Sequence, residues 1–212
     1  MNDEASPVLV WRTVPVQERS RRTVETILAA ATVLLVEGGV DALTTSALAE
    51  RTGLHVRNVY RYFPDRTAVI AALAERLNGV LEESLEGLDS LADPARAWRR
   101  AVGRLVDSLV EAGQAEPGLA AVRAALHSSP DLFALDVASD RRIAARLADA
   151  LRRRGFTGSP AHLEQHCYVL VTAAGAVLDR AVWDPTLTPE SATREVKRLA
   201  EGYLAPLLED LQ

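Results

Sequence analysis

Residues 44–66, TTSALAERTGLHVRNVYRYFPDR, contain two short helical patterns separated by a glycine. Thr44-Thr45 provides N-cap side chains for a helix expected over residues 47–52. Gly53 follows and can adopt the positive φ of a tight turn. A second helix is expected over residues 55–63, and it ends at the proline that follows.

Three positions in this stretch have the spacing of a helix-turn-helix motif. Ala49 is small enough for two helices to approach closely, Gly53 allows the turn, and Val59 can pack between the helices. The same spacing arises by chance in many helical proteins, so the side chains around it must support the assignment.

The second helix of the motif has a polar and cationic surface. If Val59 and Phe63 form its buried ridge, the outward positions are His55, Val56, Arg57, Asn58 and Arg61. Arg57 and Arg61 are our best candidates for contacts with base edges, because a guanidinium can donate two hydrogen bonds to guanine. A solvated helix face is the alternative interpretation.

Other side chains of the motif suit phosphate oxygens, which set the register of a protein on DNA without specifying sequence. Tyr60, Tyr62, Arg66 and the hydroxyl of Thr45 are the candidates. The complete predicted DNA-binding set is Thr45, Ser46, His55, Val56, Arg57, Asn58, Tyr60, Arg61, Tyr62 and Arg66.

Helical spacing continues through the rest of the chain. A first helix begins near Ser20 and stops at Gly38-Gly39, and a long fourth helix runs from Thr67 to about Leu88. Apolar residues then recur at three- and four-residue steps to the end, with no strand-like alternation. We expect an all-α fold of about nine helices.

We expect a flexible arm over residues 1–18, a helix-turn-helix domain over 19–66 and a helical domain over 67–212. The net charge is -5, but residues 12–66 hold eight arginines against six acidic residues. This distribution is weak support for a single phosphate-binding end, and Arg12 and Arg19 are candidates for a minor-groove contact.

Residues 19 to about 77 resemble the DNA-binding domain of tetracycline-repressor-like (TetR) regulators. The segments that carry the resemblance are RSRRT, ILAAATVLLVEGG, LTTSALAERTGL and VYRYFPDRTAVIAAL. The chain departs from the family pattern at His55, where Ser is frequent and is a better N-cap, at Arg57, where a small residue is common, and at Arg66. We therefore predict no operator sequence.

The resemblance implies a double-stranded DNA operator, a homodimer and a small-molecule effector that releases the DNA. The predicted effector site is apolar with Arg123 or His127 as polar anchor, although these side chains also suit an ordinary core. The predicted ligand-binding residues are Trp98, Val102, Leu105, Leu109, Arg123, Leu126, His127 and Phe133.

The last two helices are the expected dimer interface, because their small residues allow close helix packing. The residues that support it are Val169, Leu170, Val171, Ala173, Ala174, Gly175, Ala176, Leu204, Leu207, Leu208 and Leu211. A two-fold dimer with two recognition helices implies a pseudo-palindromic operator.

Other signals argue against catalysis and cofactors. His162 and His166 lie four residues apart on one helix, but a metal site needs a third ligand and we expect none. Cys167 is expected to be a buried structural thiol, and Arg152-Arg153-Arg154 to lie in water at a helix end. The chain has no phosphate loop or nucleophile elbow, so we expect no enzyme and no cofactor.

A single cysteine fits the reducing cytoplasm, and the longest uncharged stretch, residues 167–178, is too short to span a membrane. We expect a cytoplasmic repressor without a signal peptide or a membrane partner. A transcriptional activator on the same scaffold is the main alternative. A helical enzyme or metal-binding protein, or a helical adaptor that binds protein, is a weaker one.

Overall fold

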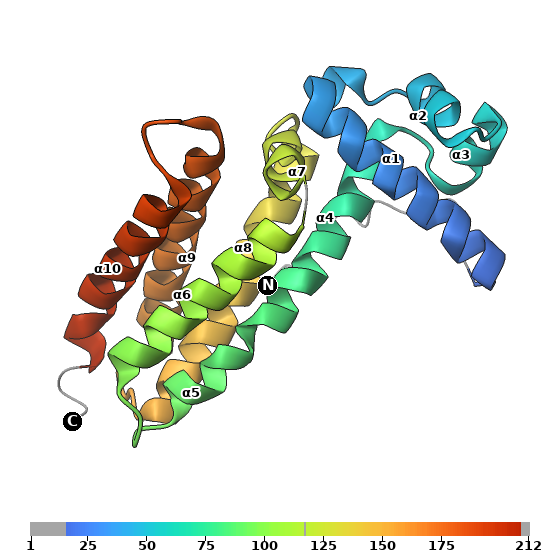
Figure 1. Ribbon diagram of the computed structural model, residues 1–212. Coiled ribbons are helices and arrows are strands. Elements are labelled where there is room, and N and C mark those ends of the chain that lie inside the picture. The colour runs from blue at the N-terminus through green and yellow to red at the C-terminus, as the bar shows by residue number, and fades with distance from the viewer. Residues whose placement is uncertain (1–15, 117, 209–212) are drawn as a thin grey trace. The chain divides into compact units, whose positions relative to one another are not determined.

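The computed structural model describes residues 16–116 and 118–208, and every regular element in these ranges is a helix. The elements are α1 (Glu18–Ala42), α2 (Thr45–Thr52), α3 (Val56–Tyr62), α4 (Arg66–Glu83), the 3₁₀ helix η1 (Ser84–Gly87), α5 (Leu88–Ala92), α6 (Trp98–Ala115), α7 (Leu119–Leu126), α8 (Pro130–Arg154), α9 (Pro160–Trp183) and α10 (Pro189–Leu208) (Figure 1). The all-α prediction is confirmed. These ranges contain one α-helix more than expected, because the long helix predicted to reach Leu88 ends at Glu83 and the short α5 follows.

The glycine pair of the first helix produces a kink. Gly38 (φ -149°, ψ 15°) and Gly39 (φ 65°, ψ -161°) leave helical geometry, and a short helical segment continues to Ala42. Only glycine adopts the conformation of Gly39 readily. The predicted stop is therefore a sharp bend that lets the chain turn toward α2.

The chain forms two compact units, each built from segments that are distant in sequence. The first unit contains the described residues up to Asn78 together with Glu116–Val137, and the second contains Gly79–Ala115 together with the described residues from Ala138. The division predicted between residues 66 and 67 concerns function, and it stays a prediction.

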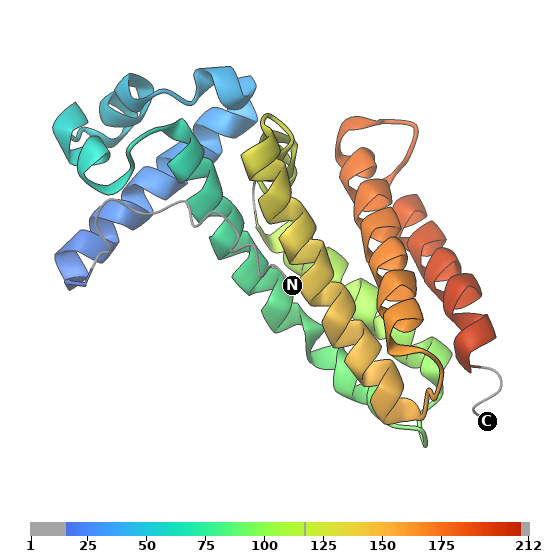
Figure 2. The same cartoon turned by 180° about the vertical axis from the view of Figure 1, so that it is seen from behind.

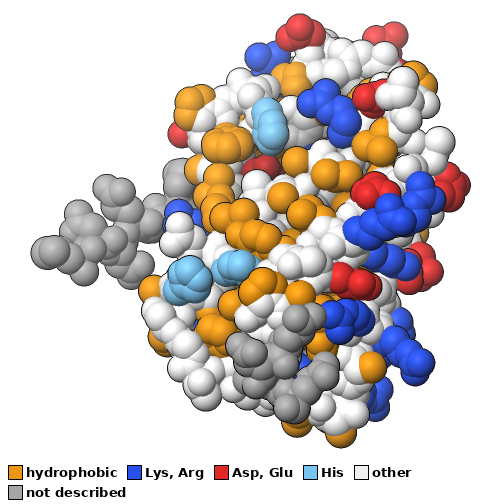
Figure 3. Space-filling view, turned by 90° about the vertical axis from the view of Figure 1, so that its left-hand side faces the viewer, with side chains coloured by type: hydrophobic (Ala, Val, Ile, Leu, Met, Phe, Trp, Pro, Cys, Tyr) orange, Lys and Arg blue, Asp and Glu red, His pale blue; other side chains and the backbone are white. Residues whose placement is uncertain are grey.

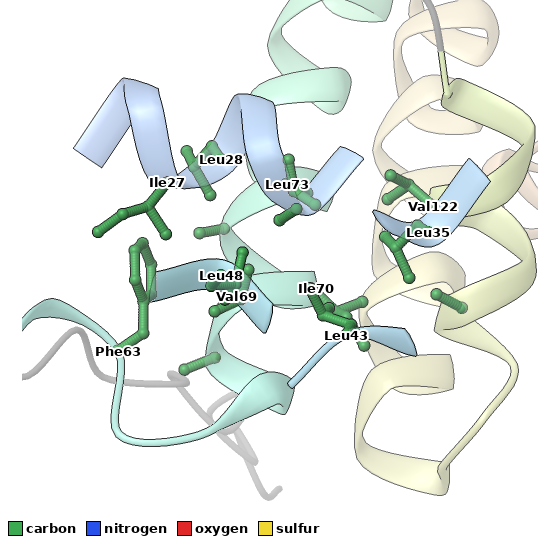
Figure 4. Packing of buried hydrophobic residues seen from close by; sticks show 14 of the residues in the cluster. Ile27, Leu28, Leu35, Leu43, Leu48, Phe63, Val69, Ile70, Leu73 and Val122 are labelled. Carbon is green, nitrogen blue, oxygen red and sulfur yellow. The ribbon is translucent and has the colours of Figure 1, made fainter. Parts of the chain in front are cut away.

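The core of the first unit is formed by apolar faces of α1, α2, α4 and α7 (Figure 4). On α1 the buried residues are Val24, Ile27, Leu28, Ala30, Ala31 and Leu35, which follow the three- and four-residue steps of one helix face. Leu48, Val59 and Phe63 are completely buried against this face. Each such side chain contributes about 1.5–3 kcal/mol by its removal from water, so the helix-turn-helix is held on a rigid base.

α1 is long and apolar enough to cross a membrane, judged by length and composition alone. Its apolar face, however, packs into the core of the first unit, where Ile27 and Ala31 are fully buried. We therefore regard α1 as a core helix.

The second unit has its own core, formed by α6, α8, α9 and α10 together with α5 and η1. Trp98, Leu151, Leu163 and Leu204 are among its largest side chains, each at most 1% exposed. α9 and α10 lie side by side in both views (Figures 1 and 2). Burial raises the pKa of the Cys167 thiol to about 12, in agreement with the predicted structural role of this residue.

The arginine run at the end of α8 corrects one expectation. Arg152 and Arg153 are exposed, but Arg154 is only 8% exposed. Its guanidinium donates hydrogen bonds to the backbone carbonyls of Leu91 (3.0 Å), Asp93 (2.8 Å) and Arg96 (2.8 Å). The prediction that Arg154 lies in water is wrong, because its guanidinium is buried and donates three hydrogen bonds to carbonyl groups at and just after the end of α5.

Candidate nucleic-acid interface

The helix-turn-helix begins with a side-chain cap at the start of α2. Thr44 has extended backbone angles, and its hydroxyl oxygen accepts the N–H of Ala47 at 3.1 Å. The helix ends at Gly53, which has φ 68° and ψ 12° in the left-handed region. Local sequence signals therefore account for both ends of α2.

The turn places α2 and α3 against each other as the residue spacing predicts. Ala49 is 6% exposed and Val59 is completely buried, and both belong to the core of the first unit. α3 is consequently fixed by one face only, and its remaining faces carry the side chains that can meet a ligand.

Most of the residues predicted to contact DNA are exposed. On α3 and its cap these are His55, Arg57, Asn58, Tyr60 and Arg61, and elsewhere in the motif they are Ser46 and Arg66. Val56 is half-buried against the core, so only part of its side chain can touch a ligand. The described structure thus gathers cationic and polar groups on one short helix.

Tyr62 does not share this surface. Its side chain is 4% exposed and packs in the core, whereas Tyr60 is 41% exposed. The assignment of Tyr62 to a phosphate contact is wrong for this conformation, because α3 turns residue 62 inward together with Val59. The guanidinium of Arg61 lies 5.7 Å from the centre of the Tyr62 ring.

Two of the predicted phosphate-binding hydroxyls meet across the motif. The Thr45 hydroxyl at the start of α2 donates a hydrogen bond of 3.2 Å to the hydroxyl oxygen of Tyr60 on α3. Because the Thr45 proton occupies this bond, the phenolic O–H of Tyr60 can donate outward. The pair is arranged to present one donor to an oxyanion.

The arginines near the motif differ in how strongly they pair with carboxylates. Arg51 makes two hydrogen bonds of 2.8 and 3.0 Å to the carboxylate of Glu37, which joins α2 to α1. Arg66 lies 3.8 Å from Asp41, and Arg19 is exposed in the first turn of α1. Arg12 lies outside the described residues.

His55 occupies the N-cap position of α3 and caps the helix with its ring. Nδ1 accepts the backbone N–H of Arg57 at 3.2 Å, and the carbonyl of His55 accepts the N–H of Asn58 at 2.7 Å. Sequence reasoning had treated histidine as a poor cap at this position. The ring is nevertheless long enough to reach back over the first turn.

Two family models match the chain. The model described as "Tetracyclin repressor-like, C-terminal domain" matches residues 97–204, and the model described as "Bacterial regulatory proteins, tetR family" matches residues 27–73. The first match alone spans just over half of the chain. This chain belongs to the TetR family.

Individual TetR relatives match the chain to different extents. The nucleoid occlusion factor SlmA of Glaesserella parasuis serovar 5 is 27% identical over 113 residues, which is 53% of each chain. The class A tetracycline repressor from transposon 1721 of Escherichia coli is 46% identical over 52 residues, 24% of each chain. The chain thus spans about half the length, or less, of these curated relatives.

Similarity to solved structures extends further along the chain. A TetR-family transcriptional regulator from Streptomyces coelicolor is 26% identical, with a TM-score of 0.62, over 87% of this chain and 99% of that one. The resemblance deduced from the helix-turn-helix is confirmed, and the chain is a TetR-family regulator.

The predicted effector residues of this TetR protein fall in both compact units. Trp98, Val102 and Leu105 are buried and Leu109 half-buried in the second unit. The others, Arg123, Leu126, His127 and Phe133, belong to the first unit.

In the first unit two of these residues contact a carboxylate that sequence reasoning missed. Asp136 is 8% exposed, and its oxygens lie 3.2 Å from Nε2 of His127 and 3.8 Å from the guanidinium of Arg123. Phe133 makes an edge-to-face contact with the His127 ring at 5.3 Å. Arg123 on α7 and His127 at its C-cap lie four residues apart, and this pair of basic side chains was the sequence signal for an acidic partner.

The histidine pair of α9 is not part of a metal centre in the described residues, where no group of at least three metal-ligating side chains gathers. His166 donates Nε2–H to the carbonyl of Tyr203 at 2.8 Å and stacks on the Tyr203 ring at 3.8 Å. His162 is exposed, with its ring 6.1 Å from that of His166. His166 thus joins α9 to α10.

An open hollow on the second unit involves none of the predicted effector residues. It lies where the end of α6 meets the start of α10, and its lining is formed by Gln114, Pro189, Glu190, Thr193, Arg194 and Lys197. All of these residues except Pro189 have a polar or charged group, whereas most of the predicted effector residues are apolar.

The apolar surface of α9 and α10 differs in part from the predicted dimer residues. Leu170, Leu204 and Leu208 are at most 5% exposed because they pack inside their own chain, so they are not available to a partner. Leu211 lies outside the described residues. The large apolar side chains exposed on these two helices are Val169, Val182, Trp183 and Leu199. Figure 3 shows apolar side chains gathered on the side of the molecule where α9 and α10 lie.

Proposed function

We propose that this TetR-family regulator is a repressor that binds a pseudo-palindromic operator as a homodimer and releases it when a small molecule binds. The observation that carries the DNA-binding part is the exposed set Arg57, Asn58 and Arg61 on a helix anchored through the buried Val59. A rigid helix with outward donors can enter the major groove, where base edges present acceptors.

The proposed division of labour follows the exposure of each side chain. Arg57, Asn58 and Arg61 contact base edges, since their side chains are exposed on α3 and form no ion pair within the described part of the chain. The hydroxyl pair of Thr45 and Tyr60 donates to a phosphate oxygen. Ser46, Val56 and Arg66 lie beside these groups along the motif and complete the surface.

We propose that the dimer forms through the exposed side of α9 and α10. Trp183 is 61% exposed and Val182 60% exposed, which is unusual for large apolar side chains that have no partner. In a two-fold dimer these side chains would be buried in both copies of the chain. A symmetric operator also requires a dimer.

The effector part of the proposal rests on the family and on one curated relative, which is by name a tetracycline repressor. Trp98, Val102, Leu105, Leu109, Leu126 and Phe133 are the proposed apolar contacts. Arg123 and His127 are the proposed polar anchors, and their contact with the buried Asp136 makes them candidates for a group that changes partners when a ligand enters. The protein would act in the cytoplasm, without catalysis.

The test is selection of bound sequences from a random duplex library, followed by affinity measurements with the Arg61→Ala variant. We expect the wild type to select a symmetric sequence, and the variant to bind it about 100-fold more weakly because a dimer loses two guanidinium contacts. Arg104→Ala is the matched control, because Arg104 is an exposed arginine on α6 of the second unit. Unchanged affinity of the Arg61 variant, with normal helicity and dimer mass, would reject the assignment.

A further inference from the structure

His55 is the residue at which this chain departs most clearly from a usual helix cap. Nδ1 of the ring accepts the N–H of Arg57 at 3.2 Å. A nitrogen that accepts a hydrogen bond must carry a lone pair, and the imidazolium has none. The capping ring is therefore neutral, with its proton on Nε2.

The same hydrogen bond restrains the direction of the ring. The backbone of His55 is held by the bond from the N–H of Asn58 to its carbonyl at 2.7 Å, and the side chain is held by the bond to Arg57. An exposed histidine normally samples several rotamers and both tautomers. In His55, Nδ1 accepts a hydrogen bond from the first turn of α3, so Nε2 carries the proton and can only donate.

No hydrogen bond or ion pair to Nε2 of His55 is present in the part of the chain that the structure describes. The side chain is exposed, and its neighbours along α3 are the exposed Arg57 and Asn58. The outward Nε2–H thus lies beside the groups for which we propose base contacts. The first residues of a recognition helix are the ones that approach base edges most closely.

We infer that His55 is a specificity-determining residue whose Nε2–H donates to an acceptor on a base edge, while Nδ1 holds the first turn of α3. This inference rests on the proposed function. A group that only donates matches guanine O6 and N7, adenine N7 or thymine O4, and it meets no acceptor at the amino groups of cytosine and adenine. A serine at the same position would cap α3 at least as well, but its side chain is too short to make this contact.

Two variants separate the cap from the base contact. His55→Ser keeps a side-chain acceptor for the helix and removes the outward donor. His55→Ala removes both. Library selection with the three proteins then compares the preferred base pair at every position of the bound sequence.

We expect His55→Ser to lose preference at one base pair of each half-site, by about tenfold for a single hydrogen bond, and to retain the preferences at the other positions. His55→Ala should lose that preference and also bind all sequences more weakly. Selection of the wild-type sequence by His55→Ser at every position would overturn the inference, and so would a uniform loss of affinity without a change in preference, which would indicate a phosphate contact.

The tautomer gives a second measurement that does not involve DNA. Long-range ¹H–¹⁵N correlation spectra of histidine-labelled protein, recorded near pH 8, should assign the His55 proton to Nε2, with the signal identified by its loss in His55→Ser. A proton on Nδ1 would overturn the inference. Failure of the proposed function is distinguishable, because then the wild-type protein itself would enrich no sequence and Arg61→Ala would change nothing.

Discussion

Gly118, the residue before α7, combines a left-handed backbone with a close contact. Its φ is 91°, and a Cβ added there would lie 2.3 Å from Cγ2 of Thr32 on α1. Gly53 also has a positive φ, 68°, but a Cβ there would meet no atom within 4 Å. Substitution of Gly53 therefore introduces backbone strain alone, whereas substitution of Gly118 introduces both backbone strain and steric overlap.

We predict that Gly118→Ala destabilises the protein by about 3 kcal/mol or more, and Gly53→Ala by about 1–2 kcal/mol, since only the first adds overlap to strain. Urea unfolding of both variants measures the difference. Thr32→Ser removes Cγ2 and should recover part of the loss when combined with Gly118→Ala, as a double-mutant cycle would show. Equal unfolding midpoints for the two glycine variants would contradict the steric explanation.

Cys167 is the only cysteine of the chain, and it is completely buried on α9. Since burial raises the pKa of its thiol to about 12, only about one molecule in ten thousand carries the thiolate at pH 8. We predict no reaction of the native protein with a thiol-specific reagent at pH 8, and reaction of one thiol per chain in guanidinium chloride. Native labelling at the rate of free cysteine would show that α9 opens locally.

At the scale of elements, the arginines of α8 hold the segment that leads from α4 to α6. Arg142 binds the carboxylate of Glu82 at 3.1 Å, and Arg146 donates to the Glu82 carbonyl at 2.9 Å, near the end of α4. Arg154 donates to three further carbonyls of the segment. The segment thus depends on side chains from a helix about sixty residues away in sequence.

We predict that Arg154→Ala destabilises the protein by about 3–5 kcal/mol, because it leaves three carbonyl groups without their charged donor. Arg154→Lys should recover only part of this, since an ammonium group cannot reproduce the planar arrangement of donors. Arg152→Ala is the control: Arg152 has an exposed ion pair with Glu164 at 3.4 Å, worth at most about 1 kcal/mol. Thermal and urea unfolding measure the stability of each variant. Similar losses of stability at residues 152 and 154 would argue against a special role for the three hydrogen bonds of Arg154.

For the whole molecule, the proposed homodimer depends on the apolar surface that α9 and α10 leave exposed. The apolar residues that recur at helical spacing on α9 and α10 are mostly buried against other helices of the same chain. A different set of apolar residues therefore remains exposed on these two helices. Trp183, at the end of α9, offers the largest exposed ring.

We predict that Trp183→Ala raises the dimer dissociation constant by about 1000-fold, because a symmetric interface loses two anchors of about 2 kcal/mol each. Unfolding of the monomer should change little, since the side chain is already exposed. Val36→Ala, a change at a 55% exposed position of α1, is the control. Sedimentation at a series of concentrations measures the constant, and an unaltered dimer would place the interface elsewhere.

Local patterns in the chain were sufficient for the helical class, the helix-turn-helix and the family, because their causes are local. The cap at Thr44, the left-handed Gly53 and the bend at Gly38-Gly39 depend on residues within one turn, and so they are visible in the sequence. The spacing of Ala49 and Val59 likewise predicted which sides of α2 and α3 meet.

Burial and long-range pairing, in contrast, could be known only from the folded chain. Neighbouring side chains on a helix look alike in sequence, yet Tyr60 is exposed and Tyr62 buried, and Arg153 is exposed while Arg154 is buried. Whether a side chain meets water or protein depends on which other helices cover it, and those helices come from distant parts of the chain. The hydrogen-bond partners of Arg154 and the apolar surface exposed on α9 and α10 were therefore decided by the packing of helices that are distant in sequence.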